Sequence, residues 1–145
     1  DRLRKIRSAL QNEIAQGLAE VEKDGDKIII RLGQQDSFSS GSADLRTSFE
    51  GTLGSVGAAI NDVGGIIRVE GHTDNVPIGF SERFKSNWDL SSARSASVAN
   101  YIIDNTGLEP GRLSIAGFAD SKPIETNDTA AGRARNRRIE VIVDG

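Results

Sequence analysis

The chain has 145 residues, the length of one ordinary domain, and 37% of them are hydrophobic, which is enough for a core. Its formal net charge of −3 argues against a general binder of nucleic acid or of anionic membranes. The absence of cysteine excludes disulfides, thiolate nucleophiles and cysteine metal sites, and a single histidine excludes a multi-histidine metal centre. We expect no cofactor.

No apolar run is long enough for a membrane-spanning helix, and no signal-peptide pattern is visible. Methionine is absent throughout, including at position 1. We therefore expect the chain to be processed or to be part of a longer protein. On that expectation, the missing membrane segment says nothing about the full-length protein.

The first 24 residues carry apolar side chains at helical spacing: Leu3, Ile6, Leu10, Ile14, Leu18 and Val21. The pattern predicts one amphipathic helix that ends near the turn at Asp24-Gly25-Asp26. This helix either packs on its own domain or serves as a linker or dimerising helix, because its spacing is close to a heptad. We divide the chain into a linker helix at 1–24 and a domain at 25–145.

The remaining pattern alternates between strands and helices. Strands are predicted at 27–32, 66–70, 112–118 and 139–143, and helices at 45–63 and 89–105, the second capped by Asp89. Helices of this length between strands favour crossover connections, with antiparallel pairing where strands follow without a helix. The expected fold is an α/β sandwich, a βαβαβ-β mixed sheet with helices on one face and an N-terminal helical extension.

The first candidate site lies at the end of the strand at 66–70, where His72, Thr73 and Asp74 follow. Ligands in open α/β sheets gather outside strand ends, which favours a binding site here. If the strand continued, His72 and Asp74 would share one face. The alternative for His72 is a hydrogen-bonded structural role.

Arg94 is the second candidate, because it falls within an apolar helix face formed by Leu90, Val98 and Tyr101. An arginine there must extend outward, pair with an acid, or face a ligand. Together, Asp74 and Arg94 would offer an acceptor for an ammonium and a fork for a carboxylate, the two ends of a zwitterion. The arginines at 133, 137 and 138 form either a solvated face or internal salt bridges, or else they make a second anion contact or help to fix Asp74.

Three motifs together resemble the OmpA-like peptidoglycan-binding domain over roughly residues 27–143. They are Gly-His-Thr-Asp at 71–74, Leu-Ser-x-x-Arg at 90–94 and Gly-Arg-x-x-Asn-Arg-Arg at 132–138. Within this region, Val-Pro-Ile at 76–78 and Phe-Lys-Ser-Asn-Trp-Asp-Leu-Ser at 84–91 look like the flagellar stator B subunits, the MotB and PomB proteins.

The resemblance implies non-catalytic binding of peptidoglycan through its diaminopimelate-containing stem peptide. Asp74 would take the ammonium of that residue and Arg94 its carboxylate. Thr73 and Asn87 would add hydrogen bonds at the pocket edge. Arg138 is the fifth expected ligand contact, although the motif does not divide the role between Arg137 and Arg138.

The resemblance also implies a periplasmic domain of a single-pass bacterial inner-membrane protein that anchors a flagellar stator to the cell wall. Its expected partners are a second copy, the stator A subunit through a membrane segment outside this chain, and periplasmic flagellar ring proteins. Residues 1–24 would then rearrange when the stator engages the wall.

Two alternatives remain open: the wall anchor of another envelope protein, such as a porin or lipoprotein, and a wall hydrolase using His72, Asp74 and a serine. The chain has no Gly-x-Ser-x-Gly motif and no second histidine, which argues against the hydrolase.

Overall fold

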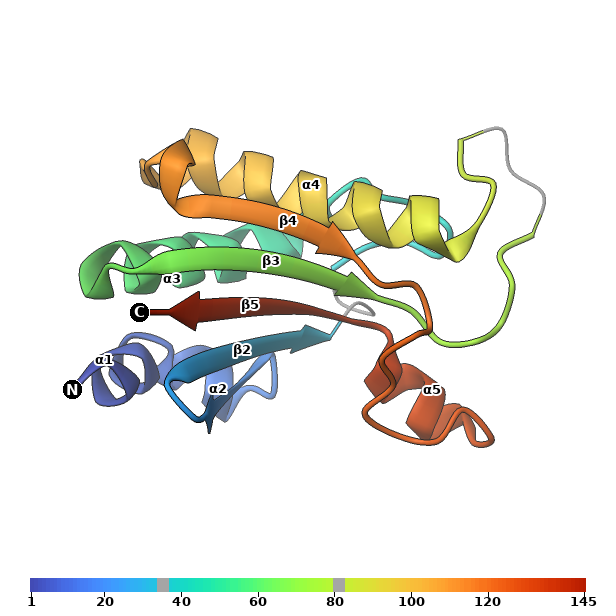
Figure 1. The fold of residues 1–145 in the computed structure, drawn as a ribbon, viewed down its shortest axis with the longest axis horizontal. Helices are drawn as coiled ribbons and strands as arrows, with labels where there is room; N and C mark the ends of the chain where they lie inside the picture. The colour runs from blue at the N-terminus through green and yellow to red at the C-terminus, as the bar shows by residue number, and fades with distance from the viewer. Residues whose placement is uncertain (34–36, 80–82) are drawn as a thin grey trace.

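A computed structural model describes residues 1–33, 37–79 and 83–145 as five strands and their covering helices (Figure 1). The strands are β1 (Ala19–Asp24), β2 (Lys27–Gly33), β3 (Ile66–His72), β4 (Leu113–Gly117) and β5 (Arg138–Asp144). They form one sheet in the order β1-β2-β5-β3-β4. Only β3 and β4 are parallel among these neighbours; the other pairs are antiparallel. The predicted mixed sheet is confirmed.

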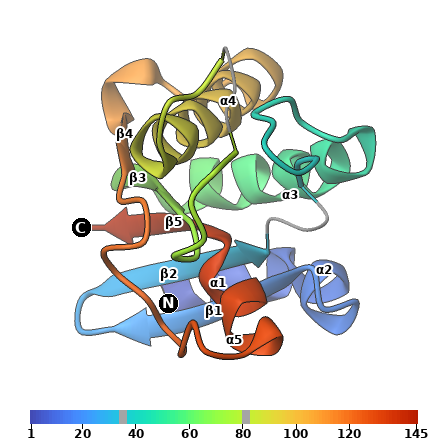
Figure 2. The same cartoon turned by 90° about the vertical axis from the view of Figure 1, so that its right-hand side faces the viewer.

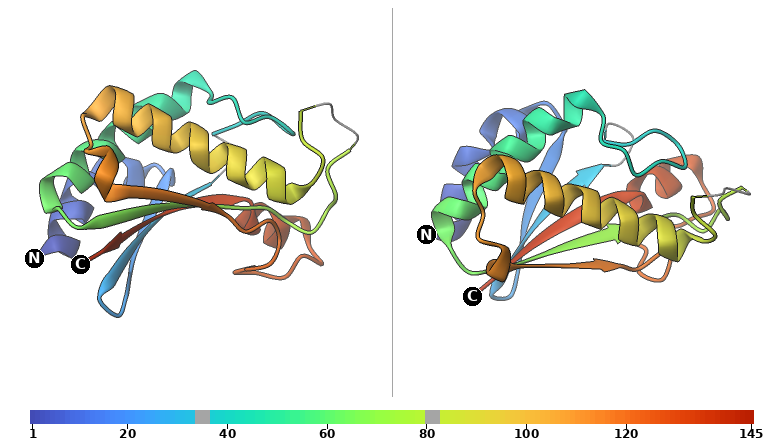
Figure 3. Two further views of the ribbon diagram at one scale, coloured as in Figure 1. Left: turned by 45° about the horizontal axis from the view of Figure 1, so that its top comes forward. Right: turned by 90° about the horizontal axis from the view of Figure 1, so that it is seen from above.

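Helices cover one face of this sheet, as Figures 2 and 3 show. They are α1 (Arg2–Ala9), α2 (Gln11–Ala15), α3 (Thr47–Val63) and α4 (Asn87–Thr106), while the 3₁₀ turn η1 (Pro110–Arg112) leads into β4. Alternate residues of the strands, such as Ile30, Val69 and Val141, are fully buried in one core with Leu53, Ile60 and Val98 of the helices. None of the described helices is long and apolar enough to cross a membrane.

The single N-terminal helix that we predicted is shorter in the structure and is divided at Leu10 into α1 and α2. Gly17 adopts a left-handed φ of 75° after α2, and residues 19–24 form β1, an edge strand paired with β2. The facing pair Asp24 and Lys27 leaves only Gly25 and Asp26 as a two-residue hairpin turn, with Gly25 at φ 61°. The predicted helix is therefore wrong beyond Ala15, because the apolar spacing at 18 and 21 also suits the start of a short strand.

The two predicted internal helices are confirmed, and both have glycines at their C-termini. Gly64 follows α3 at φ 70° and Gly107 follows α4 at φ 74°. The N-cap of α4 is Ser86 and not Asp89. The Ser86 hydroxyl accepts from the Asp89 N–H at 3.3 Å, while the Asp89 carboxylate accepts from the N–H of Lys85 at 3.1 Å.

One helix was not predicted: α5 (Ala130–Asn136) lies within the segment expected to be a loop before the last strand. It sits beyond the ends of β2 and β3, at the same end of the sheet as the N-terminus of α4 (Figure 1). This end of the molecule brings together the three motifs singled out in the sequence.

Candidate functional site

A pocket of about 480 Å³ opens where β3 ends and α4 begins. Four of the five predicted contact residues line it: Thr73, Asp74, Asn87 and Arg94. The other lining residues are Phe38, Ser40, Gly41, Arg46, Val76, Pro77, Ile78, Gly79, Leu90 and Arg137. Arg138 is not among the lining residues, and Arg137 is present in its place.

Asp74 is fixed directly beyond the end of β3. Its Oδ1 accepts from the Val76 N–H at 3.0 Å and its Oδ2 accepts from Nη1 of Arg137 at 2.6 Å. The preceding Thr73 is buried; its N–H donates to the Ala119 carbonyl and its hydroxyl donates to the Asp74 carbonyl. The carboxylate is thus buried and held in one orientation, as an acceptor for a cation requires.

Arg94 reaches the same pocket from the N-terminal half of α4, and it is only 5% exposed. Its Nε donates to the Ser42 carbonyl at 2.7 Å and its Nη2 to the Ser39 carbonyl at 3.0 Å. The guanidinium also lies 4.9 Å from the centre of the Phe38 ring. Burial, and to a lesser extent the charge of Arg137, lower the pKa of Arg94 to about 10, so it stays cationic at neutral pH.

Glycines allow α4 to lie close enough to the sheet for Arg94 and Asp74 to share a pocket. A Cβ at Gly71 would overlap the carbonyl oxygen of Ser91, and a Cβ at Gly117 would overlap the hydroxyl of Ser92. Gly71 and Gly117 face each other on β3 and β4. The close approach of this strand pair to the first half of α4 therefore requires glycine at both positions.

Asn87 joins the loop after β3 to the start of α4. Its side-chain amide donates to the Val76 carbonyl at 3.0 Å. This bond holds the apolar segment 76–78 at the pocket mouth. Asn87 lines the pocket, and its observed bond is to the protein itself.

The side chains of the two adjacent arginines of the third motif point to different sites. Arg138 is buried and donates to Glu140 at 2.6 Å, to the Asn136 carbonyl at 3.0 Å and to the Lys122 carbonyl at 2.9 Å. Arg137 instead points to Asp74. Successive side chains of an extended chain point to opposite sides, which separates the two arginines at the start of β5.

His72 and Asp74 also separate, because β3 ends at His72 and the predicted shared face is lost. His72 faces the sheet surface opposite the helices, where its Nε2 lies 3.2 Å from Oε1 of Glu70 and its ring stacks on Phe118. The residue is buried and does not line the pocket. This placement supports the structural role that we left open.

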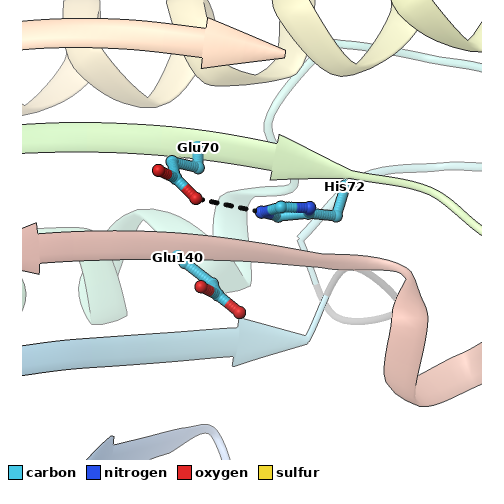
Figure 4. A group of neighbouring side chains, drawn as sticks. All are labelled: Glu70, His72 and Glu140. Carbon is cyan, nitrogen blue, oxygen red and sulfur yellow. Dashed lines mark hydrogen bonds and ion pairs between the residues drawn. The ribbon is translucent and has the colours of Figure 1, made fainter. Parts of the chain in front are cut away.

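Glu70, His72 and Glu140 form the one group of potential metal ligands found among the described residues, their ligand atoms lying within 4.8 Å of one another (Figure 4). Arginines already serve both carboxylates: Arg68 binds Glu70 at 3.1 Å, and Arg31 and Arg138 bind Glu140 at 3.2 and 2.6 Å. Their charges oppose a further cation. We assign the group to an ion-pair network that braces the sheet.

Sequence reasoning missed Arg46 as a pocket residue and left the choice between Arg137 and Arg138 open. The register at the start of β5 determines which of Arg137 and Arg138 faces the pocket. The alternation of residues 138–144 was the sequence signal for this register. Arg46 is the extended N-cap residue of α3 and lies outside any periodic segment, so no pattern pointed to it. The pocket therefore contains more positive charge than the motifs predicted.

The OmpA family model matches residues 37–137, which include Asp74, Arg94 and Arg137. The chain belongs to the OmpA family. It is 44% identical to motility protein B of Bacillus subtilis over 77 residues, 53% of this chain and 29% of that protein. It is 28% identical to YtxE of Bacillus subtilis over 141 residues, 97% of this chain and 58% of YtxE.

Two solved structures share this OmpA-family fold over nearly the whole chain. The cell wall anchor of the T6SS from Pseudomonas aeruginosa is 36% identical with a TM-score of 0.92, covering 100% of this chain and 99% of that one. A MotB-like protein from Desulfovibrio vulgaris is 27% identical with a TM-score of 0.91, covering 99% of this chain and 91% of that one. The predicted resemblance to OmpA-like domains and to MotB is confirmed.

Proposed function

We propose that this OmpA-family domain binds peptidoglycan without cleaving it, through the diaminopimelate residue of the stem peptide. The observation that carries the proposal is the placement of Asp74 and Arg94 in one pocket. The free end of diaminopimelate bears an ammonium and a carboxylate. Asp74 accepts from the ammonium, and the planar guanidinium of Arg94 binds the carboxylate.

Thr73 and Asn87 hold the pocket edge, and Arg137 takes the role first expected of Arg138. Thr73 fixes the backbone of Asp74, and Asn87 fixes the segment at 76–78. Arg137 holds the Asp74 carboxylate in the ligand-free state. A carboxylate has about four lone-pair sites, so a ligand ammonium can share Asp74 with Arg137.

The separation of His72 from Asp74 supports binding over hydrolysis. A serine hydrolase needs a histidine in contact with both a nucleophile and an acid, and His72 instead contacts Glu70 outside the pocket. Incubation with fluorescently labelled sacculi checks this point: we expect retention of the protein and no release of soluble fragments.

The likeness to motility protein B supports a role in anchoring a flagellar stator to the wall, so that the motor can generate torque. On this proposal the chain is the periplasmic part of an inner-membrane protein that dimerises and assembles with a stator A subunit. The T6SS wall anchor, similar over the whole chain, supports a second candidate, the anchor of another envelope complex. Deletion in the host separates them: loss of swimming with intact flagella supports the stator.

Binding is tested with purified sacculi and with a soluble diaminopimelate tripeptide. Asp74→Asn and Arg94→Gln each remove a charge-assisted contact worth about 1.5–3 kcal/mol, so affinity falls about tenfold to a hundredfold. Asp104→Asn and Arg4→Gln change exposed residues outside the pocket and serve as matched controls. Wild-type affinity in both pocket variants contradicts the assignment.

A further inference from the structure

We propose that Arg46 is a second anion contact of the pocket and selects stem peptides with a free carboxylate outside the zwitterionic end of diaminopimelate. This inference rests on the proposed function, because it takes the stem peptide as the ligand. It adds a residue that none of the three motifs contains. It also predicts a preference between chemical forms of the same peptide.

The first argument is the charge of the pocket. Among the described residues, its charged lining consists of Arg46, Arg94, Arg137 and Asp74. The chain as a whole has a net charge of −3, so this pocket has the opposite sign from the rest of the protein. A ligand end with one ammonium and one carboxylate is neutral and leaves the positive excess unbalanced. A second carboxylate on the ligand would balance it.

The second argument is the availability of the Arg46 guanidinium. Arg137 donates to Asp74, and Arg94 donates to the carbonyls of Ser39 and Ser42. The Arg46 side chain is exposed and, within the described part of the chain, makes no hydrogen bond or ion pair. Its backbone is nevertheless fixed, because its N–H donates to the Ser37 carbonyl at 2.8 Å. Arg46 therefore lines the pocket from an anchored backbone, with its side-chain donors available to a ligand.

The third argument is the size of the pocket. Its volume of about 480 Å³ falls in the range of about 300–1,000 Å³ that is typical of sites for whole small molecules. One amino-acid head group between Asp74 and Arg94 leaves room for the neighbouring part of the peptide. In the stem peptide this part includes the α-carboxylate of γ-linked D-glutamate, unless that group is amidated.

The test compares two tripeptides of L-alanine, γ-D-glutamate and meso-diaminopimelate by isothermal titration calorimetry. One has every carboxylate free, and in the other the two carboxylates outside the zwitterionic end are amidated. We expect the wild-type domain to bind the free acid about tenfold more tightly, the effect of one charge-assisted contact. Arg46→Gln should lose this preference while it keeps its affinity for the amidated peptide.

Arg46→Lys should keep part of the preference, because it retains the charge without the planar fork. Arg4→Gln removes the same charge from an exposed position on helix α1 and should keep the full preference. Equal wild-type affinity for the two peptides, or an unchanged preference in Arg46→Gln, overturns the inference and leaves the proposed function standing. If the wild-type domain binds neither tripeptide and does not bind sacculi, the proposed function itself is contradicted.

Discussion

Arg137 donates a 2.6 Å hydrogen bond to Oδ2 of Asp74, joining two residues that are 63 positions apart in the chain. The bond links the end of β3 to the start of β5 and leaves the carboxylate with a cation before any ligand arrives. Asp74 is therefore both a candidate ligand contact and a structural tie at this end of the sheet.

This tie predicts a measurable coupling energy. Arg137→Ala leaves a buried carboxylate with only the Val76 N–H, which should lower the free energy of unfolding by about 1–3 kcal/mol. A double-mutant cycle with Asp74→Asn, measured by urea denaturation, should give a coupling of about 0.5–3 kcal/mol. Arg135→Ala removes an exposed pair with Glu20 and should cost no more than about 1 kcal/mol. Equal losses in Arg135→Ala and Arg137→Ala would contradict the predicted tie.

The ion-pair network around Glu70, His72 and Glu140, on the sheet surface opposite the helices, predicts a loss of stability in acid. Burial alone raises the pKa of Glu140, but the hydrogen bond and charge of Arg138, followed by the charges of His72 and Arg31, lower it below 4.5. The resulting stabilisation is complete above pH 4.5 and is lost as the pH falls through the folded-state pKa. Thermal melts from pH 7 down to pH 2 should show this loss.

Glu140→Gln is the matched variant for that experiment. It removes the carboxylate charge to which Arg138 donates at 2.6 Å, so it should lower stability at pH 7 by about 1.5–3 kcal/mol. Its melting temperature should also fall less steeply in acid than that of the wild type. An identical acid slope in both proteins would show that Glu140 is not the titrating group.

Gly71 should tolerate no side chain. Gly71→Ala places a Cβ against the Ser91 carbonyl, so α4 must move away from β3, and we expect a loss of stability of about 1–3 kcal/mol together with weaker peptide binding. Gly51→Ala is the control, because it lies on the exposed side of α3 with open space around it and should gain up to about 1 kcal/mol. Chemical denaturation of both variants checks the contrast.

The N-terminal helix should be part of the cooperative fold. Ile6 of α1 is fully buried in the main core, so Ile6→Ala should lower the free energy of unfolding by about 2–5 kcal/mol. Ile14 of α2 is 36% exposed, and Ile14→Ala should cost much less. If both variants unfold like the wild type, α1 is not docked in solution, which would favour the predicted movable linker.

Long periodic segments were predictable from the sequence, and short ones were not. The apolar stripes of α3 and α4, the run of isoleucines in β2 and the alternation in β5 each extend over several residues and suit one type of element. In α5 the segment Ala-Ala-Gly-Arg-Ala-Arg-Asn has no apolar stripe. It is held instead by Asn136, whose side chain bonds the backbone of Ile124 and Glu125. A contact of this kind between a side chain and a loop backbone produces no periodic pattern in the sequence.

The same distinction applies to the pocket. Asp74 and Arg94 were predictable, because one ends a strand and the other interrupts an apolar helix face. The position of Arg137 depends on strand register, because Arg138 pairs with His72 across β3 and β5 and the Arg137 side chain points to the opposite side. The position of Arg46 depends on the path of the loop before α3, where its N–H donates to the Ser37 carbonyl. Neither relationship is local in sequence.

The position of β5 between β2 and β3 has a consequence for biosynthesis. β5 is the last strand of the sheet in sequence order, so neither the β1–β2 hairpin nor the β3–α4–β4 unit has its inner neighbour before β5 has been synthesised. Translation that stops before β5 would leave two half-sheets with unpaired edges. The sheet is therefore completed only when β5 pairs on both sides, and deletion of residues 138–144 should abolish folding.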